Sequence, residues 1–178
     1  MFYLSSILLL LFMGIVFFVL FSLAYAGLSA APWVPLSNKE IRRMLSLAGV
    51  KPGEKVYDLG SGDGRILIIA AREFGAETVG YEISILPYII SKIRIAFARL
   101  QDKIKINFSS FYKTDLSEAD VITVFLLPEA MKKLSPIFRK GLKPGARIVS
   151  YAFAMKDWEP MKVDKPDPKT MAIYLYRA

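Results

Sequence analysis

The first 38 residues contain no charged side chain, and this feature constrains the chain more than any other. The first charged residue is Lys39, so all 24 Lys+Arg and all 16 Asp+Glu residues follow the apolar head. Within the head, residues 7–26 (ILLLLFMGIVFFVLFSLAYA) include only one clearly polar side chain, that of Ser22. A helix of this length rises about 30 Å, which is the thickness of a bilayer's hydrocarbon core. The sequence therefore predicts a transmembrane anchor over residues 1–31 and one further domain over residues 32–178.

A cleaved signal peptide is the alternative for this head, because Ala24-Tyr25-Ala26 has the small-x-small cleavage pattern. However, the flank Met1-Phe2-Tyr3 lacks Lys and Arg, and the apolar run exceeds an ordinary signal-peptide core. A retained, single-pass anchor is therefore the favoured interpretation. Basic residues that follow the helix, Lys39, Arg42 and Arg43, predict that the N-terminus is outside and the domain cytoplasmic.

Composition excludes several kinds of chemistry for the domain. The chain has no cysteine and no histidine, so disulfides, thiolate metal sites, a cysteine nucleophile and a histidine base are all ruled out. The sequence offers no metal site. The remaining candidate catalytic groups are carboxylates, hydroxyls, lysines and aromatic rings.

Strand and helix patterns alternate along the domain. Strands are expected at residues 55–58, 78–82, 104–108, 120–126, 146–153, 161–164 and 170–176, the last two forming a hairpin. Helices are expected from about residue 37, at 65–74, at 86–100 and at 128–140, the last interrupted at Ser135-Pro136. The third of these helices has the apolar residues Leu86, Ile89, Ile90, Ile93, Phe97 and Leu100 on one side. This order predicts an α/β, Rossmann-like, seven-stranded and mostly parallel sheet with helices on both faces and one antiparallel pair.

A glycine-rich turn follows the first strand. Gly60, Gly62 and Gly64 allow a sharp strand-to-helix turn and the close approach of a ligand to the main chain. The spacing GxGxG is not the GxGxxG of dinucleotide sites, and acidic Asp63 stands where a phosphate would bind. A ligand without phosphates, and with a positive charge, suits this turn better. Glu82, which ends the next strand, is placed to accept hydrogen bonds from the two hydroxyls of a ribose.

These residues resemble the first motif and the ribose-binding acid of class I S-adenosylmethionine-dependent methyltransferases. The resemblance runs from about Pro32 to Ala178, and a narrower one involves the membrane-anchored lysine methyltransferases of the ATP synthase c-subunit and the adenine nucleotide translocase. The narrower likeness lies in residues 32–37, 57–65, 124–129 and 157–160. One departure is Ser109-Ser110-Phe111, where that family usually has Gly-Asp-Phe.

The resemblance implies S-adenosylmethionine as the cofactor and a binding role for eight residues of this chain. The main chain of the turn, including Ser61, would hold the amino-acid part, and Asp58 would orient the turn or reach the ammonium group. Glu82 would hold the ribose. Phe111 would pack on the adenine, with Ser110 accepting one hydrogen bond. The eight are Asp58, Gly60, Ser61, Gly62, Gly64, Glu82, Ser110 and Phe111.

Candidates for the methyl-acceptor side are Glu129 after the fourth strand, Tyr151 after the fifth and Trp158. The entry segment Val34-Pro35 is a further candidate for the wall of an acceptor channel. Each has a plainer explanation, because Glu129 at a helix start can stabilise the helix dipole and the two aromatic rings can be packing residues. A lysine acceptor must lose a proton, which a channel of low polarity favours by lowering its pKa.

Three functions are compatible with the sequence. The first is a membrane-tethered methyltransferase acting on lysine in a membrane or membrane-proximal protein, and the second is a methyltransferase for a lipid or small amphiphile. The third is a non-catalytic cofactor-binding or scaffold protein. The net charge of +8 favours contact with anionic lipid, whereas the basic runs lack the interleaved aromatics and recognition motif of a nucleic-acid site. No nucleic-acid partner is therefore expected.

Overall fold

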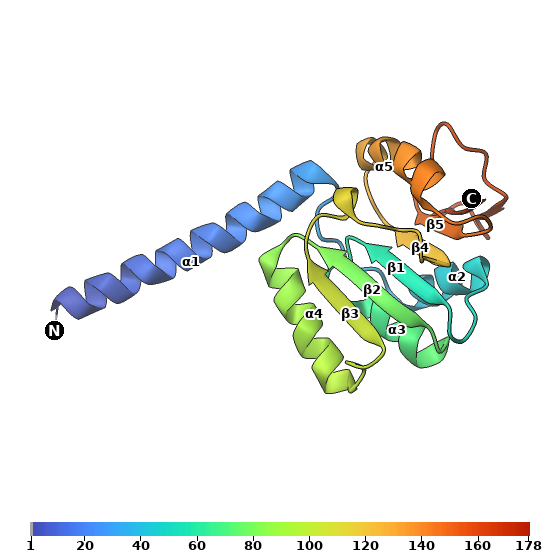
Figure 1. The fold of residues 1–178 in the computed structure, drawn as a ribbon. Coiled ribbons are helices and arrows are strands. Elements are labelled where there is room, and N and C mark those ends of the chain that lie inside the picture. The colour runs from blue at the N-terminus through green and yellow to red at the C-terminus, as the bar shows by residue number, and fades with distance from the viewer. Residues whose placement is uncertain (1) are drawn as a thin grey trace.

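The computed structural model of the chain describes residues 2–178, with side chains from Tyr3 onward (Figure 1). The helices are α1 (Phe2–Ser29), α2 (Asn38–Ala48), α3 (Arg65–Glu73), α4 (Ile85–Ala98), the short 3-10 helix η1 (Phe111–Lys113) and α5 (Pro128–Gly141). The strands are β1 (Lys55–Leu59), β2 (Glu77–Glu82), β3 (Ile104–Phe108), β4 (Val121–Val124), β5 (Arg147–Tyr151), β6 (Lys162–Asp164) and β7 (Ile173–Arg177). Each expected strand and helix is present, with ends that differ by a few residues.

The seven strands form one sheet in the order β3-β2-β1-β4-β5-β7-β6. Strands β1 to β5 pair in parallel, so their carboxyl ends share one edge of the sheet. The mostly parallel Rossmann-like sheet is thus confirmed. The expectation of a single antiparallel pair is wrong, because β7 runs antiparallel both to β5 and to β6. The hairpin joins the sheet through β7, which runs opposite to β5, so both the hairpin pair and its junction with the sheet are antiparallel.

Helices cover the two faces of the sheet unequally. Alternate residues of one strand belong to different cores: Val121 packs with α2 and α3, whereas Ile122 packs with α5. Helix α4 continues the first layer, where its residue Ile95 packs with Leu67 of α3. Three helices therefore lie on one face, and α5 is the one long helix packed against the other within the described residues.

Two helices differ from the sequence expectation in an informative way. Helix α5 is not interrupted, but continues through Pro136 to Gly141. Fully buried Leu134 and Phe138 lie on either side of the proline and hold both halves of the helix against the sheet. In α4 most of the predicted apolar side faces outward, and the buried residues are Pro87, Ser91 and Ile95. Leu100, the last residue of the predicted side, follows the helix and packs against Ile95 and its core neighbours.

Helix α1 projects from the domain (Figure 1). Its side chains from Tyr3 to Phe18 are exposed, and its buried residues begin at Ser22. Residues 3–29 form the one described helix that is long and apolar enough to cross a membrane. Only the last part of this helix belongs to the packed body of the molecule.

Candidate functional site

The glycine turn connects β1 to α3 at the carboxyl edge of the sheet. Gly60, Gly62 and Gly64 all have positive φ, at 86°, 53° and 76°. A Cβ added to Gly62 would lie 3.0 Å from Trp33 Cδ1, and one added to Gly64 would lie 2.2 Å from Ser91 Oγ. Side chains are therefore excluded here both by backbone conformation and by space. The turn leaves Gly62 directly beneath the indole of Trp33.

Asp58, at the end of β1, carries an unpaired buried oxygen. Its side chain is 2 % exposed, and its Oδ1 accepts a hydrogen bond of 2.8 Å from Thr123 Oγ1 on β4. Its Oδ2 has no partner within the described part of the chain. Burial raises the pKa of Asp58 to about 7 against the opposing hydrogen bond from Thr123, with the charges of Glu82 and Asp63 adding to the rise. A cationic group bound at Oδ2 would stabilise the charged form of this carboxylate.

Glu82, at the end of β2, fixes the turn from the neighbouring strand. Its Oε2 accepts a hydrogen bond of 2.9 Å from Gly62 N, while its Oε1 accepts from Ile83 N at 2.9 Å and from Ser84 N at 2.7 Å. A carboxylate has about four acceptor positions, so Oε2 retains one for a ligand hydroxyl. The same side chain can therefore hold the turn and a ribose.

Asp63, which also lines the ligand side of the turn, is paired with two arginines. Arg65 donates to it at 2.7 and 2.9 Å, and Arg94 of α4 forms a second ion pair with it. Burial acts to raise the pKa of Asp63, but the hydrogen bonds and charge of Arg65, together with Arg94, outweigh burial and the pKa is lowered. Arg65 also donates to the carbonyl of Leu36 at 2.6 Å. The acid that the sequence places at the helix start therefore stabilises the turn and its contact with the entry segment.

A cleft opens beside the turn, between the strand ends and the entry segment. The entry segment forms one wall through Trp33, Val34 and Pro35, as expected for Val34-Pro35. The other walls are formed by Asp58, Gly60, Ser61, Gly62, Asp63, Tyr81, Glu82, Phe111, Phe125 and Leu126. The cleft thus has a polar floor at the strand ends and an apolar rim.

The end of α1 also lines this cleft, which the sequence did not indicate. Ala26 and Ala30 contribute to its wall. Ser22 Oγ accepts a hydrogen bond of 2.9 Å from Ile85 N at the start of α4, and Ala30 O accepts one of 3.1 Å from Leu127 N. Ser22 could have indicated that the end of α1 packs against the domain, since it is the one clearly polar residue of the apolar run.

Most of the residues expected to hold a cofactor converge on the cleft. Asp58, Gly60, Ser61, Gly62, Glu82 and Phe111 line it. Gly64 instead begins α3. Ser110 is exposed beside the cleft and its Oγ accepts a hydrogen bond of 3.4 Å from Tyr112 N, which caps η1. The contact of Ser110 with adenine remains a prediction.

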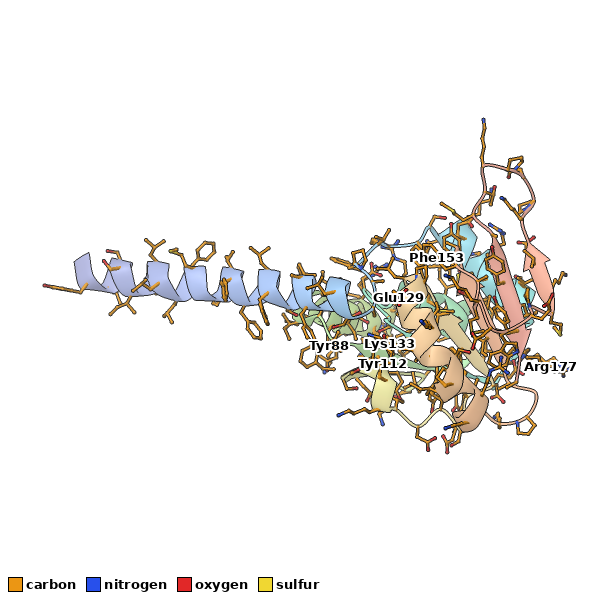
Figure 2. All side chains as sticks on the ribbon, turned by 90° about the horizontal axis from the view of Figure 1, so that it is seen from above. Tyr88, Tyr112, Glu129, Lys133, Phe153 and Arg177 are labelled. Carbon is orange, nitrogen blue, oxygen red and sulfur yellow. The ribbon has the colours of Figure 1, made fainter. Side chains whose placement is uncertain are left out.

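The three side chains proposed for the acceptor side, those of Glu129, Tyr151 and Trp158, do not line the cleft. Glu129 is exposed in the first turn of α5, at the end of that helix near α1 (Figure 2). Tyr151 is 9 % exposed and lies behind a wall residue, with its ring centroid 5.0 Å from that of Phe125. Burial, followed by the charge of nearby Glu40, raises the pKa of Tyr151. Its geometry suits a packing residue that positions Phe125.

Trp158 lies against the other end of α5. The guanidinium carbon of Arg139 is 4.6 Å from its ring centroid, and the ring of Tyr176 is 6.1 Å away. Arg139 is in the last turn of α5, whereas the cleft adjoins the residues that precede the first turn. This placement favours the packing alternative for Trp158.

The site fits S-adenosylmethionine on its own geometry. An unpaired buried carboxylate oxygen suits the ammonium group, the acceptor position left on Glu82 suits a ribose hydroxyl, and buried Phe111 offers a ring to the adenine. No group of three or more potential metal ligands occurs among the described residues.

Comparisons with known proteins agree with this geometry. The family described as "ANTKMT methyltransferase domain" matches residues 58–162. A protein-lysine N-methyltransferase of Saccharolobus islandicus is 40 % identical over 82 % of this chain and 92 % of that protein. The adenine nucleotide translocase lysine N-methyltransferase of mouse is 33 % identical over 74 % of this chain, which spans only 57 % of the mouse protein.

A solved structure has the same fold with a related ligand bound. It is described as an RNA methyltransferase from Salinibacter ruber in complex with S-adenosyl-L-homocysteine. It has a TM-score of 0.77 and 38 % sequence identity, and the match covers 81 % of this chain and 93 % of that one.

Proposed function

Because the chain belongs to the family of ANTKMT methyltransferase domains and is an S-adenosylmethionine-dependent methyltransferase, we propose that it methylates lysine in a protein within or beside the membrane that holds α1. The observation that carries this proposal is that α1 is both the candidate membrane span and part of the wall of the cleft. An acceptor that reaches this cleft must therefore approach it close to the membrane surface. Family membership sets aside the non-catalytic scaffold alternative.

The height of the cleft above the membrane follows from the length of α1. Residues 3–21 rise about 28 Å, close to the hydrocarbon thickness of a bilayer. Ser22, the first buried residue of α1, is hydrogen-bonded to the start of α4, and Ala26 and Ala30 line the cleft. The cleft then lies at the depth of the lipid headgroups. A lysine in a loop just outside the membrane is at the right height to enter it.

Bound S-adenosylmethionine supplies an electrophilic methyl group on a sulfonium. The chain positions this group through Asp58, Glu82 and the turn. Trp33, Pro35 and Phe125 form an apolar wall on the other side of the cleft. Such surroundings lower the pKa of an entering lysine and so favour the neutral amine that reacts. The reaction needs no histidine base, which this chain lacks.

The acceptor class is tested by incubating full-length protein with native membranes and methyl-labelled S-adenosylmethionine. Label in protein supports the proposal if it no longer appears when the lysines of the membranes are chemically blocked before the reaction. Label in the lipid extract would support the lipid or small-amphiphile alternative. Label in RNA would support the chemistry named for the Salinibacter ruber protein, against our expectation of no nucleic-acid partner.

The tether is tested separately by removing residues 2–18, which are the part of α1 outside the packed body. Helix residues that line the cleft remain, so binding of S-adenosylmethionine should be retained while methylation of membrane proteins is lost. Full-length protein should resist extraction with alkaline carbonate, and extraction would contradict the tether. Protease added to sealed cells should leave the domain intact if it is cytoplasmic, as Lys39, Arg42 and Arg43 predict.

A further inference from the structure

Helix α4 carries an apolar stripe that is exposed on the surface of the domain. Its four large side chains, Leu86, Ile89, Ile93 and Phe97, are 36, 46, 50 and 86 % exposed, and we call them the outer stripe. Their spacing places them along one side of the helix. Pro87, Ser91 and Ile95, which are buried, lie on the opposite side. Outward-facing apolar residues in such a row usually mark a surface that binds a partner or a membrane.

The position of α4 relative to α1 indicates what covers the stripe. The first residue of α4 donates its N–H to Ser22 Oγ of α1 at 2.9 Å, and Ser84 Oγ, one residue earlier, lies 3.3 Å from Ser22 O. Figure 1 shows α4 on the side of the domain from which α1 projects, running across the direction of α1. If α1 stands upright in a bilayer, α4 lies parallel to the surface at the level where α1 leaves the hydrocarbon.

Charged residues flank the outer stripe as they do on helices that lie in a membrane interface. Lys92 is exposed beside the stripe, and Arg99, the residue that caps the end of α4, is exposed as well. The Nζ of Lys92 lies 5.9 Å from the ring of Tyr88. On the other edge Arg94 is paired with Asp63 of the glycine turn. Helix α4 is therefore packed against the cofactor turn on one side and free to contact lipid on the other.

We propose that α4 is a second membrane contact, with its outer stripe buried at the boundary between headgroups and acyl chains and Lys92 and Arg99 on anionic headgroups. This inference rests on the membrane tether of the proposed function. One spanning helix leaves a domain free to tilt and rotate, whereas a second contact with the membrane surface removes most of that freedom. The cleft is then held at one height and in one orientation toward acceptors in the membrane.

The absence of cysteine from the chain permits a direct test with single introduced cysteines. Full-length Ile93→Cys and Phe97→Cys, each labelled with an environment-sensitive fluorophore, are reconstituted into vesicles of phosphatidylcholine and phosphatidylglycerol. Leu10→Cys on the exposed part of α1 reports the tether. Lys169→Cys, in the exposed connection between β6 and β7, reports the aqueous side, since Figure 1 places this region away from α1.

Labels at Ile93 and Phe97 should be blue-shifted and quenched by lipids that carry a shallow nitroxide. The label at Lys169 should show neither effect. If the Leu10 label is blue-shifted but those at Ile93 and Phe97 behave like Lys169, the inference about α4 is overturned and the tether stands. If the Leu10 label is not blue-shifted relative to the Lys169 label, the tether itself fails.

A charge-bearing variant gives a second readout. Ile93→Glu with Phe97→Glu changes only exposed side chains, so its affinity for S-adenosylmethionine should equal that of the wild type. Quenching of a label at Ile89 should be lost in this variant. Disulfide cross-linking between two copies of the unlabelled Phe97→Cys variant in vesicles would instead identify a second chain as the occupant of the stripe and overturn the proposal.

Discussion

The two sides of the cleft are built in different ways. On the cofactor side, hydrogen bonds from three strand ends and tight contacts around the glycines fix each group, so that Glu82 alone accepts three main-chain hydrogen bonds. On the side that we propose faces the acceptor, the wall is mostly apolar and comes from the end of α1, the entry segment and Phe125. Binding of a fixed small molecule requires the first kind of wall. Admission of a long side chain such as lysine requires the second.

Among substitutions on the two sides of the cleft, we expect Gly64→Ala to have the largest effect on stability and on cofactor binding. Its Cβ would lie 2.2 Å from Ser91 Oγ, and its φ is 76°. Gly145 has a similar φ of 85° with nothing within 4 Å of its Cβ, so Gly145→Ala carries only the conformational cost of about 1–2 kcal/mol. Gly64→Ala should lose roughly 2 kcal/mol more, the range for overpacking, and should abolish cofactor binding.

Urea denaturation and calorimetry measure the two effects of Gly64→Ala. Ser91→Ala removes the closest atom and should restore part of the lost stability. Equal destabilisation by Gly64→Ala and Gly145→Ala would show that the contact with α4 does not constrain the turn.

Glu82→Ala should weaken S-adenosylmethionine binding by about 10–100-fold, the loss expected when a charged hydrogen-bonding group is removed. Glu77→Ala is the matched control, because Glu77 is exposed at the start of the same strand. Isothermal calorimetry on both variants decides the assignment. Equal affinities for Glu82→Ala and wild type would exclude Glu82 from the cofactor site.

Asp58 should make cofactor binding depend on pH. With its pKa raised to about 7, Asp58 is mostly protonated at pH 6, and a bound ammonium group would drive the proton off. Affinity should therefore rise from pH 5 to about pH 7 and then level off, with proton release at pH 6 visible in buffers of different ionisation enthalpy. Asp58→Asn should lose the pH dependence and about tenfold in affinity at pH 8.

The raised pKa of Asp58 also makes the stability of the ligand-free protein depend on pH. Because burial holds the pKa of Asp58 above its unfolded value, its contribution to folding becomes less favourable as pH rises from about 4 to about 7. Asp58→Asn should remove this loss of stability at high pH. The denaturation midpoints of the ligand-free variant and the ligand-free wild type should therefore differ more at pH 8 than at pH 4. A difference that does not change with pH would contradict the raised pKa.

On the acceptor side, Glu129→Gln should lower methyl transfer by less than about tenfold and leave S-adenosylmethionine affinity unchanged. We expect this modest loss because Glu129 is exposed and lies outside the cleft. A group that transfers a proton directly contributes about a hundredfold or more to the rate. Steady-state kinetics with native membranes measure it. Unchanged turnover would remove Glu129 from the list of catalytic candidates.

The smallest effect is expected from Trp158→Phe, which should cost about 1 kcal/mol of stability through the weaker contact with Arg139. Turnover and cofactor affinity should not change. A loss of turnover at unchanged stability would instead restore the catalytic role that the sequence allowed for Trp158.

The cofactor side could be predicted from the sequence because its residues are close together along the chain and their types are dictated by local conformation. Ser61, Gly62 and Glu82 are examples, since a turn and the following strand bring them to one sheet edge without help from distant segments. The acceptor side could not be predicted in this way. Tyr151 and Trp158 are aromatic residues after β5, and only packing against Phe125 and Arg139 distinguishes their places.

The sequence by itself determined the apolar helix, the order of strands and helices, and the family of the cofactor turn, because periodicity, charge and turn residues are local properties. The tertiary structure alone decided that Ser22 of that helix is bonded to the start of α4 and that Ala26 lines the cleft. It also decided that Asp63 is paired with Arg94 and that the apolar stripe of α4 faces outward. A pattern of apolar residues gives a helix one apolar side. Whether that side is buried in the core or exposed on the surface depends on contacts between segments far apart in the chain.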